Sequence, residues 1–379
     1  MLKLGIIGYG FRAFTMLKEI LRTGEVIVSA VCDVSLDAAK KYADENGVTD
    51  FNYYTDAKEM LDKEKLDGVF VGTRCSTHTD YALLVASYGI PLFLEKPVAT
   101  NREDVERLKG ILHHSDKTVV SFPLRVTDIV LRVREIVASG RLGTISQIQA
   151  YNNVPYGRVY YHDWYRDESE TGGLFLQKST HDFDYINSLI DSVAPVSVCA
   201  MESKMVFKGD KPAGGVCDRC PEKSTCPEGP DNLRKIGVDP TGNRCCFAVD
   251  TGNQDSGSAI VRYENGLHVV YTQNFVARRG AAKRGARLIG YLGTLEFDFP
   301  SANITVYDHA SATKEVIDMS DDKGVHFGGD RRLAEGFIKV MRGEPSPSTL
   351  AEGILSVEMC LAAKESTAEE RFVPINFRK

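Results

Sequence analysis

The stretch Lys3–Ala13, which reads KLGIIGYGFRA, sets the fold class of this 379-residue chain. Its first five residues have the length and apolar content of a strand, and the helical pattern Phe11–Arg22 follows. In this setting Gly8 permits a tight turn, Gly10 lets a pyrophosphate approach the backbone, and Ala13 lets the helix pack closely on the strand. The stretch therefore predicts a dinucleotide-binding loop rather than ordinary turn glycines. The residues expected to contact the dinucleotide are Gly8, Tyr9, Gly10, Phe11 and Arg12.

The residue after the second predicted strand indicates which dinucleotide binds. Asp33 follows that strand, 25 residues after Gly8. This is near the spacing at which a carboxylate accepts the ribose 2′-hydroxyl group of NAD. The next residues, Val34 and Ser35, supply no arginine that could hold the 2′-phosphate of NADP. We therefore expect NAD, with NADP as the weaker candidate.

Strand-like and helix-like segments alternate along residues 1–123. This alternation is typical of a parallel sheet with helices on both faces, and right-handed crossovers make it a doubly wound Rossmann domain. The expected strands are Lys3–Ile7, Ile27–Cys32, Phe51–Tyr54, Gly68–Val71, Pro91–Leu94 and Thr118–Phe122. The expected helices are Phe11–Arg22, Ser35–Asn46, Asp56–Lys63, Thr79–Ser87 and Arg102–His113.

The pattern changes after Pro123, and residues 124–379 are expected to form an α+β domain for substrate binding and oligomerisation. Alternating apolar residues from about Val196 to Val306 indicate a largely antiparallel open sheet. A Cys-rich insertion at about 208–254 interrupts this sheet. Because an open sheet face must be covered, we expect a homodimer or homotetramer. The helices expected here are Thr127–Ala138, His181–Ile190, Arg331–Met341 and Leu350–Ser366.

The composition excludes several classes of protein. The chain has 46 Lys and Arg against 52 Asp and Glu, a net charge of −6, so it lacks the basic balance of a nucleic-acid or anionic-membrane protein. No apolar run approaches the roughly 18 residues that a membrane span needs. The start of the chain lacks the layout of a signal peptide and leads directly into the first strand. We therefore expect a cytoplasmic protein.

The fifth predicted strand ends in Leu94-Glu95-Lys96-Pro97. Ligands of doubly wound sheets bind beyond the carboxyl ends of the strands, so Lys96 is expected to point toward the nicotinamide. The alternative is a lysine that extends into solvent at the end of the strand.

Four motifs in chain order resemble those of the oxidoreductase family that groups glucose–fructose oxidoreductase, inositol dehydrogenase and rhizopine-catabolism proteins (Gfo/Idh/MocA). The resemblance covers almost the whole chain. One departure is Arg74, which stands where the family's T-P-x-x-x-H motif has proline. The motifs are the loop Gly8–Ala13, the segment Thr73–His78, the E-K-P signature Glu95-Lys96-Pro97, and Gly172-Gly173 with His181 and Asp184.

The resemblance implies where each chemical role lies. Lys96 and His181 would meet the reacting hydroxyl group of a sugar, polyol or cyclitol. Histidine is a suitable base near neutral pH, and an ammonium group stabilises developing alkoxide charge. The alternative for His181 is a structural core or capping histidine. The further residues expected at the cofactor are Thr73, Arg74, His78 and Glu95, together with Lys96 itself.

A second departure lies four residues before His181, on the same helical face. The family usually has aspartate there, and this chain has Gln177, followed by Lys178. Glutamine can orient a substrate but cannot take a proton. Gln177 and Lys178 are therefore counted as catalytic candidates, and the substitution leaves the identity of the base and the direction of the reaction open.

An aromatic and polar loop is expected to bind the substrate. Its rings offer stacking faces and its hydroxyl, imidazole and guanidinium groups offer hydrogen bonds to a sugar. The alternative is that at least half of these rings form a small core under the loop. The substrate candidates are Tyr160, Tyr161, His162, Trp164, Tyr165 and Arg166, with His326 and Asp330 from a later Gly-rich turn.

The Cys-rich insertion has the spacing of a metal site. Cys217-x-x-Cys220-x5-Cys226 is followed by Cys245, with Cys246 as the alternative fourth ligand. Four thiolates suit tetrahedral zinc, and an iron–sulfur cluster or metal-free cysteines are the alternatives. The glycines and prolines of the insertion cannot form a core, so a metal ion would stabilise it.

The favoured function is NAD-dependent hydride transfer to or from a secondary hydroxyl or keto group of a sugar, a sugar derivative or a cyclitol. One alternative keeps the oxidation as a transient step and leads to net cleavage of a glycoside. A second alternative is a non-catalytic sensor that binds the nucleotide, which the presence of Lys96 and His181 argues against.

Overall fold

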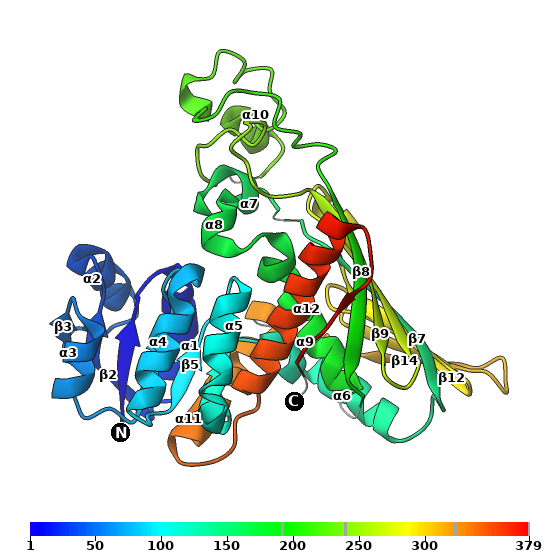
Figure 1. The fold of residues 1–379 in the computed structure, drawn as a ribbon, viewed down its shortest axis with the longest axis horizontal. Coiled ribbons are helices and arrows are strands. Elements are labelled where there is room, and N and C mark those ends of the chain that lie inside the picture. The colour runs from blue at the N-terminus through cyan, green and yellow to red at the C-terminus, as the bar shows by residue number, and fades with distance from the viewer. Residues whose placement is uncertain (156, 191–192, 239–240, 321–324, 378–379) are drawn as a thin grey trace.

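The computed structural model describes residues 1–379 except 156, 191–192, 239–240, 321–324 and 378–379. Within this part of the chain, the first sheet contains six parallel strands in the order β3-β2-β1-β4-β5-β6. Helices cover both of its faces (Figure 1), which confirms the doubly wound class. Its strands are β1 (Leu2–Ile7), β2 (Val26–Cys32), β3 (Asn52–Tyr54), β4 (Gly68–Val71), β5 (Leu92–Leu94) and β6 (Thr118–Val120).

The helices of this sheet begin where the sequence provides a cap. The side chains of Ser35, Asp56 and Asn101 each accept a hydrogen bond from a backbone N–H of the first turn that follows. Helix α1 has no such side chain, because Gly10 stands at its N-terminus. The backbone N–H groups there are left for a ligand. The helices are α1 (Phe11–Leu21), α2 (Leu36–Glu45), α3 (Ala57–Lys63), α4 (His78–Ser87) and α5 (Arg102–Lys109).

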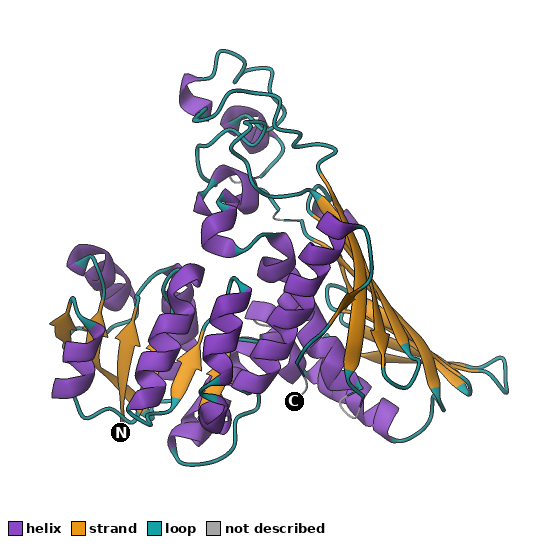
Figure 2. Ribbon diagram, viewed as in Figure 1, coloured by secondary structure: helices purple, strands orange, loops and turns teal. Residues whose placement is uncertain are grey.

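The second sheet is larger and mostly antiparallel, as Figure 2 shows in orange. In the described residues its strand order is β14-β13-β12-β11-β7-β10-β9-β8-β15, and β7 and β10 form the parallel pair. Residues of β9 alternate between buried and exposed positions, as expected of a strand with one covered face. The strands are β7 (Ile145–Asn153), β8 (Pro195–Ser203), β9 (Ser256–Tyr263), β10 (His268–Asn274), β11 (Lys283–Gly290), β12 (Gly293–Asp298), β13 (Asn303–Asp308), β14 (Lys314–Asp318) and β15 (Val373–Pro374).

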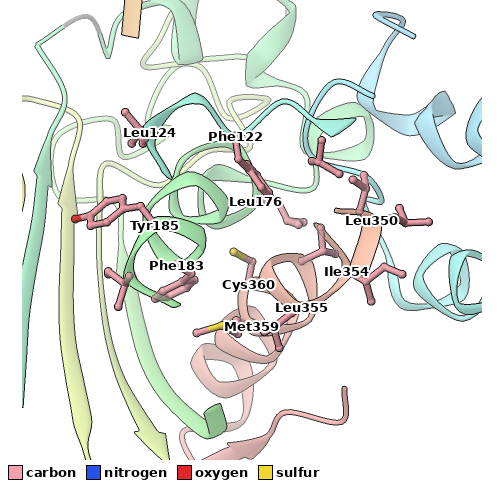
Figure 3. Close-up of a cluster of buried hydrophobic side chains, with 14 of the residues drawn as sticks. Phe122, Leu124, Leu176, Phe183, Tyr185, Leu350, Ile354, Leu355, Met359 and Cys360 are labelled. Atoms are coloured by element: carbon pink, nitrogen blue, oxygen red, sulfur yellow. The ribbon is translucent and has the colours of Figure 1, made fainter. Parts of the chain in front are cut away.

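Helices α6 (Asp128–Ala138), α9 (Thr180–Leu189) and α12 (Leu350–Glu369) lie along one side of this sheet (Figure 1). Their side chains fill the core between the two sheets. Figure 3 shows Phe183 of α9 on the side of Met359 and Cys360 of α12, while the Tyr185 ring of α9 points away from α12, toward Phe297 and Phe299. The residues labelled there are Phe122, Leu124, Leu176, Phe183, Tyr185, Leu350, Ile354, Leu355, Met359 and Cys360.

Helix α11 (Gly329–Met341) returns from the second half of the chain to the first sheet. Its Phe337 ring lies 5.5 Å from the ring of Phe93 in β5, edge to face. A Cβ atom at Gly68 would stand 2.5 Å from the sulfur of Met341, so this glycine allows the close approach. The return places the N-terminal turn of α11 beside the start of α1.

The segment between β7 and α9 is more ordered than the loop expected from its sequence. It contains α7 (Val159–His162), a 3₁₀ turn at Trp164–Arg166 and α8 (Glu168–Thr171), followed by a π-helix at Phe175–Ser179. The Cys-rich insertion carries a 3₁₀ turn at Cys217–Arg219 and α10 (Pro230–Lys235). The remaining 3₁₀ turns are Cys75–Thr77, Leu112–Lys117, Pro123–Val126, Arg279–Ala281 and Val325–Gly328. In the described part of the chain, none of the helices combines the length and apolar character required to cross a bilayer.

Candidate active site

The glycine loop has the geometry of a dinucleotide cradle. Gly8 has a φ of +81°, and a Cβ atom there would stand 2.6 Å from Thr73 Cγ2 and 2.9 Å from the Thr73 backbone. Gly8 is therefore required by conformation and by space. A Cβ atom at Gly10 would meet nothing within 4 Å, so the space over the start of α1 is open. A pyrophosphate group fits there, against N–H groups at the positive end of the helix dipole.

Asp33 lies at the carboxyl end of β2, beside this loop. Its carboxylate accepts hydrogen bonds from the backbone N–H of Tyr9 at 2.8 Å and of Ser35 at 2.9 Å. The Tyr9 ring is buried, and its hydroxyl oxygen accepts a hydrogen bond from Asn46 at 3.1 Å, so this side chain faces the core. Phe11 is exposed at the first turn of α1.

Arg12 links three elements at the carboxyl edge of the sheet. Its Nε donates to Glu95 Oε1 at 2.8 Å, and its two terminal nitrogens donate to the Asp330 carboxylate at 2.9 Å each. It also donates to Ser121 Oγ at 3.1 Å. Burial alone would lower the pKa of Arg12, but the two carboxylates outweigh it and raise the pKa above its ordinary value. The observed contacts of this guanidinium are with protein, and its role at the pyrophosphate remains a prediction.

The Thr73–His78 segment supports the glycine loop. The buried His78 ring lies between two carbonyl oxygens, with Nδ1 2.7 Å from Pro97 O and Nε2 3.3 Å from Thr73 O. Burial lowers the pKa of His78, and the shorter of its two contacts is the one between Nδ1 and Pro97 O. The exposed Arg74 guanidinium lies 3.7 Å from the centre of the Trp164 ring. Thr73 therefore lies against Gly8, and Arg74 reaches the segment expected to bind the substrate.

Lys96 is the second residue after β5, and its side chain reaches the π-helix that precedes α9. Its Nζ donates to the backbone carbonyl oxygen of Gln177 at 2.9 Å. Burial, and then the nearby charge of Lys178, lower the pKa of Lys96 to about 8. Glu95, the preceding residue, is buried and accepts from Arg12 and from Ser121 at 3.0 Å. The E-K-P signature therefore holds a lysine that can exist in either protonation state near neutral pH.

His181 lies in the first turn of α9, one turn after Gln177. Its ring is buried, and its Nδ1 has no hydrogen-bond partner among the described residues. Burial lowers the pKa of His181 well below its ordinary value, and Lys96 is the largest of the neighbouring charges that lower it further. Phe122 lies edge to face with this ring at 5.8 Å. The structure therefore brings Lys96 and a neutral His181 into one electrostatic neighbourhood.

Gln177 and Lys178 contribute to the site in different ways. The side-chain amide of Gln177 donates to Cys75 Sγ at 3.4 Å and to Thr171 O at 3.2 Å. The buried Lys178 places its Nζ 5.1 Å from the centre of the Tyr160 ring. Both residues belong to the π-helix, an irregularity that is frequent at functional sites.

The predicted substrate residues divide into two groups. Trp164 stacks on Tyr165 with ring centres 3.9 Å apart, and Tyr165 lies edge to face with Tyr160 at 5.6 Å. Burial, followed by the nearby Cys75 and Glu95, raises the pKa of Tyr165. These rings lie between Arg74, which contacts Trp164, and Lys178, which lies over Tyr160.

Tyr161, His162 and Arg166 face the opposite way. Tyr161 packs on Phe207 with ring centres 4.1 Å apart and donates to Gln254 O at 2.6 Å. It belongs with Tyr160 to a small apolar cluster, so the alternative that some of these rings form a core is observed. His162 and Arg166 contact the Cys-rich insertion, and substrate contact by these three residues remains untested.

His326 and Asp330 lie at the start of α11. His326 Nδ1 lies 3.0 Å from Asp330 Oδ2, and the His326 ring centre lies 6.1 Å from that of His181. His326 adopts φ +48° and ψ +43°, a left-handed conformation that is uncommon for a residue with a side chain. The Gly-rich turn therefore brings His326 close to His181, while Asp330 is bound to Arg12.

Sequence reasoning missed Ser121 and Cys75. Ser121 follows β6 and contacts both Glu95 and Arg12, so the rule that ligands lie beyond strand ends could have identified it. Cys75 lies among polar residues in the Thr73–His78 segment, and only the fold shows that its buried thiol accepts a hydrogen bond from Gln177.

The thiols of the insertion surround one cavity. It encloses about 20 Å³, room for roughly one water-sized sphere. All nine cysteines of the chain are free, and no three His, Cys, Asp or Glu side chains among the residues that the structure describes stand as a group ready to hold a metal ion. The zinc prediction therefore remains a prediction. The cysteines that line the cavity are Cys217, Cys220, Cys226, Cys245 and Cys246.

Comparisons with known proteins agree with this geometry. The chain is 23% identical to the rhizopine catabolism protein MocA of Rhizobium meliloti, over 75% of this chain and 89% of that protein. It is 25% identical to the myo-inositol 2-dehydrogenase of Thermotoga maritima, over 48% of this chain and 53% of the relative. A levoglucosan dehydrogenase solved with NADH and levoglucosan has the same fold, with a TM-score of 0.79, 16% identity and 99% of both chains covered.

The family comparison covers both sheets. Residues 2–122 match the oxidoreductase family with an NAD-binding Rossmann fold, GFO_IDH_MocA. Residues 130–296 match the GFO/IDH/MocA C-terminal domain. Together with the glycine cradle and the Lys96–His181 neighbourhood, these matches establish that the chain belongs to the GFO/IDH/MocA family of NAD-binding oxidoreductases.

Proposed function

We propose that this protein is a dehydrogenase that transfers hydride between NAD and a secondary alcohol or ketone of a sugar, a sugar derivative or a cyclitol. One observation carries the proposal. A lysine with a lowered pKa and a buried, neutral histidine share the carboxyl edge of a sheet whose glycine loop is shaped for a dinucleotide.

The two side chains divide the proton chemistry of alcohol oxidation. Burial and neighbouring cations keep His181 neutral, so its imidazole can accept the hydroxyl proton. The Lys96 ammonium donates a hydrogen bond to the same oxygen and stabilises its developing negative charge. When bound, NAD supplies the hydride acceptor. In reduction, His181 returns the proton to the carbonyl oxygen.

The residues around Lys96 suit a ring that carries several hydroxyl groups. Trp164 and Tyr165 offer stacking faces, and Lys178 and the backbone around it offer polar contacts. The names of the relatives point the same way, because one is a dehydrogenase of myo-inositol and another is a dehydrogenase of levoglucosan. The proposed substrate class, a sugar or cyclitol, thus rests on the side chains around Lys96 and on the names of the relatives.

Asp33 favours NAD over NADP. Its carboxylate lies beside the loop, bound to the backbone of Tyr9 and Ser35, where a 2′-phosphate would add like charge. Glycoside cleavage through transient oxidation is the second candidate. It is favoured by Gln177, which places an amide where the family usually has a carboxylate, and by the neighbouring amine of Lys178.

A structural zinc ion, bound by Cys217, Cys220, Cys226 and Cys245, is proposed for the insertion. The cavity between the thiols suits one ion better than a larger iron–sulfur cluster. Lys211 and Lys223 also line it and would balance the charge of four thiolates. Cys246 lies in the apolar cluster with Tyr160, which favours Cys245 as the fourth ligand. A cytoplasmic homo-oligomer remains the expected form of the protein.

A substrate screen tests the proposed function. Free sugars, glycosides and inositols are incubated with NAD, and absorbance is followed at the NADH band. We expect steady NADH formation with at least one class, and a rate lower by about two orders of magnitude from a Lys96→Ala variant that still binds NAD. Product release from glycosides without net NADH would favour the cleavage alternative. Equal turnover by Lys96→Ala would contradict the assigned chemistry.

A further inference from the structure

We propose that the Cys-rich insertion is a positioning module for the active site. It holds the substrate segment, defined here as Val159–Thr171, through the buried side chain of Arg166. This inference rests on the proposed function, because it assigns the rings of that segment to substrate binding. It makes Arg166 and Asp250 positioning residues, which act on the substrate through Trp164 and its neighbours.

Arg166 points into the insertion. It is buried, and one terminal nitrogen donates to the backbone carbonyl oxygen of Cys245 at 3.1 Å. The other donates to Asp250 Oδ1 and to Thr251 Oγ1, each at 2.7 Å. In return the backbone N–H of Gly252 donates to Arg166 O at 3.2 Å. A buried guanidinium with this many contacts fixes the position of the backbone that carries it.

Two further residues contact the insertion: His162 within the segment, and Arg158 directly before it. His162 Nδ1 lies 2.7 Å from Arg244 O, and the Arg244 N–H donates to His162 O at 3.1 Å. Arg158 Nε lies 3.3 Å from Glu228 Oε2. A Cβ atom at Gly242 would overlap His162 O, so the two backbones meet closely there.

The other side of the segment carries the rings at the active site. Trp164 stacks on Tyr165 and lies under the Arg74 guanidinium, while Tyr160 lies beside Lys178. Figure 1 shows α7 and α8 between α10 of the insertion and the rest of the molecule. Because His162 and Arg166 contact the insertion while Trp164 lies against Arg74, a shift of the insertion would move the Trp164 ring.

Trp164 gives a direct readout, because the chain contains one tryptophan. The test compares Asp250→Asn, which removes the charged partner of Arg166, with Asp231→Asn. Asp231 lies in the same insertion and pairs with Arg234 on α10 at 2.9 Å, on the exposed side. Asp250→Glu, which keeps the charge, serves as the rescue variant. Emission and acrylamide quenching of Trp164 are measured in each protein, followed by KM, kcat and the Kd for NAD.

We expect Asp250→Asn to move the Trp164 emission to longer wavelength and to increase its quenching. It should raise KM for the sugar or cyclitol by about tenfold, with kcat and the Kd for NAD within about twofold of wild type. Asp231→Asn should match wild type, and Asp250→Glu should recover most of the difference.

Wild-type Trp164 emission in Asp250→Asn would overturn the proposal, and so would a mobile Trp164 with an unchanged KM. If Asp250→Asn failed to fold, Arg166→Lys, which keeps the buried charge, would take its place with the same expected results. If no sugar or cyclitol reacts with the wild type, the proposed function fails. The Trp164 measurement still reports in that case whether the insertion holds the segment.

Discussion

The two halves of the active site are held in different ways. The cofactor half depends on backbone geometry close in sequence to its motif, such as the left-handed Gly8 and the carboxylate of Asp33 on the N–H of Tyr9. The substrate half depends on contacts with residues about 80 to 90 positions later, such as Arg166 with Asp250 and His162 with Arg244. A family can therefore keep its cofactor site constant and alter its substrate site by changing the distant segments that contact it.

The sharpest test of the cofactor half compares two glycine substitutions. Gly8→Ala places a methyl group against the Thr73 backbone at a positive φ, so it should lower the free energy of unfolding by more than about 2 kcal/mol and abolish measurable NAD binding. Gly10→Ala meets no protein atom within 4 Å, so its stability should remain near wild type. It should still weaken NAD binding by at least about tenfold, because the methyl group enters the pyrophosphate space. The measurements are chemical denaturation and NAD titration.

Wild-type NAD affinity in Gly10→Ala would show that the open space over α1 is not the cofactor site. The contrast between the two halves would then no longer hold.

The first sheet could be predicted closely because its signals are local. The strand predicted at Gly68–Val71 is β4 with the same bounds, and Ser35 and Asp56 cap helices at the predicted starts. The π-helix at Phe175–Ser179 could not be predicted, because every residue in it is buried and no periodicity distinguishes it. The ion pair of Arg12 with Asp330 spans 318 positions and is set by the return of α11, which no local pattern encodes.

The metal content of the purified protein tests whether a zinc ion stabilises the Cys-rich insertion that contacts the substrate segment. Purified protein should contain about one zinc ion per chain. Cys220→Ser, or chelation of the wild type, should lower Tm by several degrees and leave the Kd for NAD unchanged. Cys199→Ser, at a cysteine of β8 outside the insertion, is the matched control. Protein without zinc, in which all five clustered thiols react with a thiol reagent, would remove the proposed ion.

The pH dependence of kcat/KM separates the roles of Lys96 and His181. The pKa of Lys96 is lowered to about 8, and its charged form is the one that stabilises the alkoxide. The rate should therefore fall as the pH rises through about 8, while the lowered pKa of His181 keeps that base neutral at pH 6.5 and above. A rate that rises through pH 8 would instead make Lys96 the base.

Asp33→Ala should have the smallest effect. Loss of the carboxylate removes the repulsion of a 2′-phosphate, so the preference for NAD over NADP, measured as a ratio of kcat/KM, should fall by about tenfold or less. Asp37→Ala, at an exposed acid in the first turn of α2, is the control and should leave the ratio unchanged. An unchanged ratio in Asp33→Ala would count against the ribose assignment.

The sequence motifs could identify candidate residues of the site, but they could not give the directions of all its side chains. Lys96 and His181 were singled out from their motifs, and Lys96 Nζ donates to the backbone oxygen of Gln177, one helical turn before His181, while their catalytic roles remain predictions. The direction of Arg166 was not predictable, because its partners lie in an insertion that has no periodic pattern. Residue type indicated a polar loop, and only the fold shows which side chains of that loop face the site.

The central claim is that Lys96 and His181 act on one oxygen atom, and a double-mutant cycle tests it most directly. Turnover is measured for Lys96→Ala, for His181→Gln and for the double variant, each under saturating NAD. Each single change should lower kcat by about two orders of magnitude, and the double variant should lose little more than the worse single. Losses that multiply to about four orders of magnitude, or a Lys96→Ala variant near wild-type turnover, would contradict a shared oxygen.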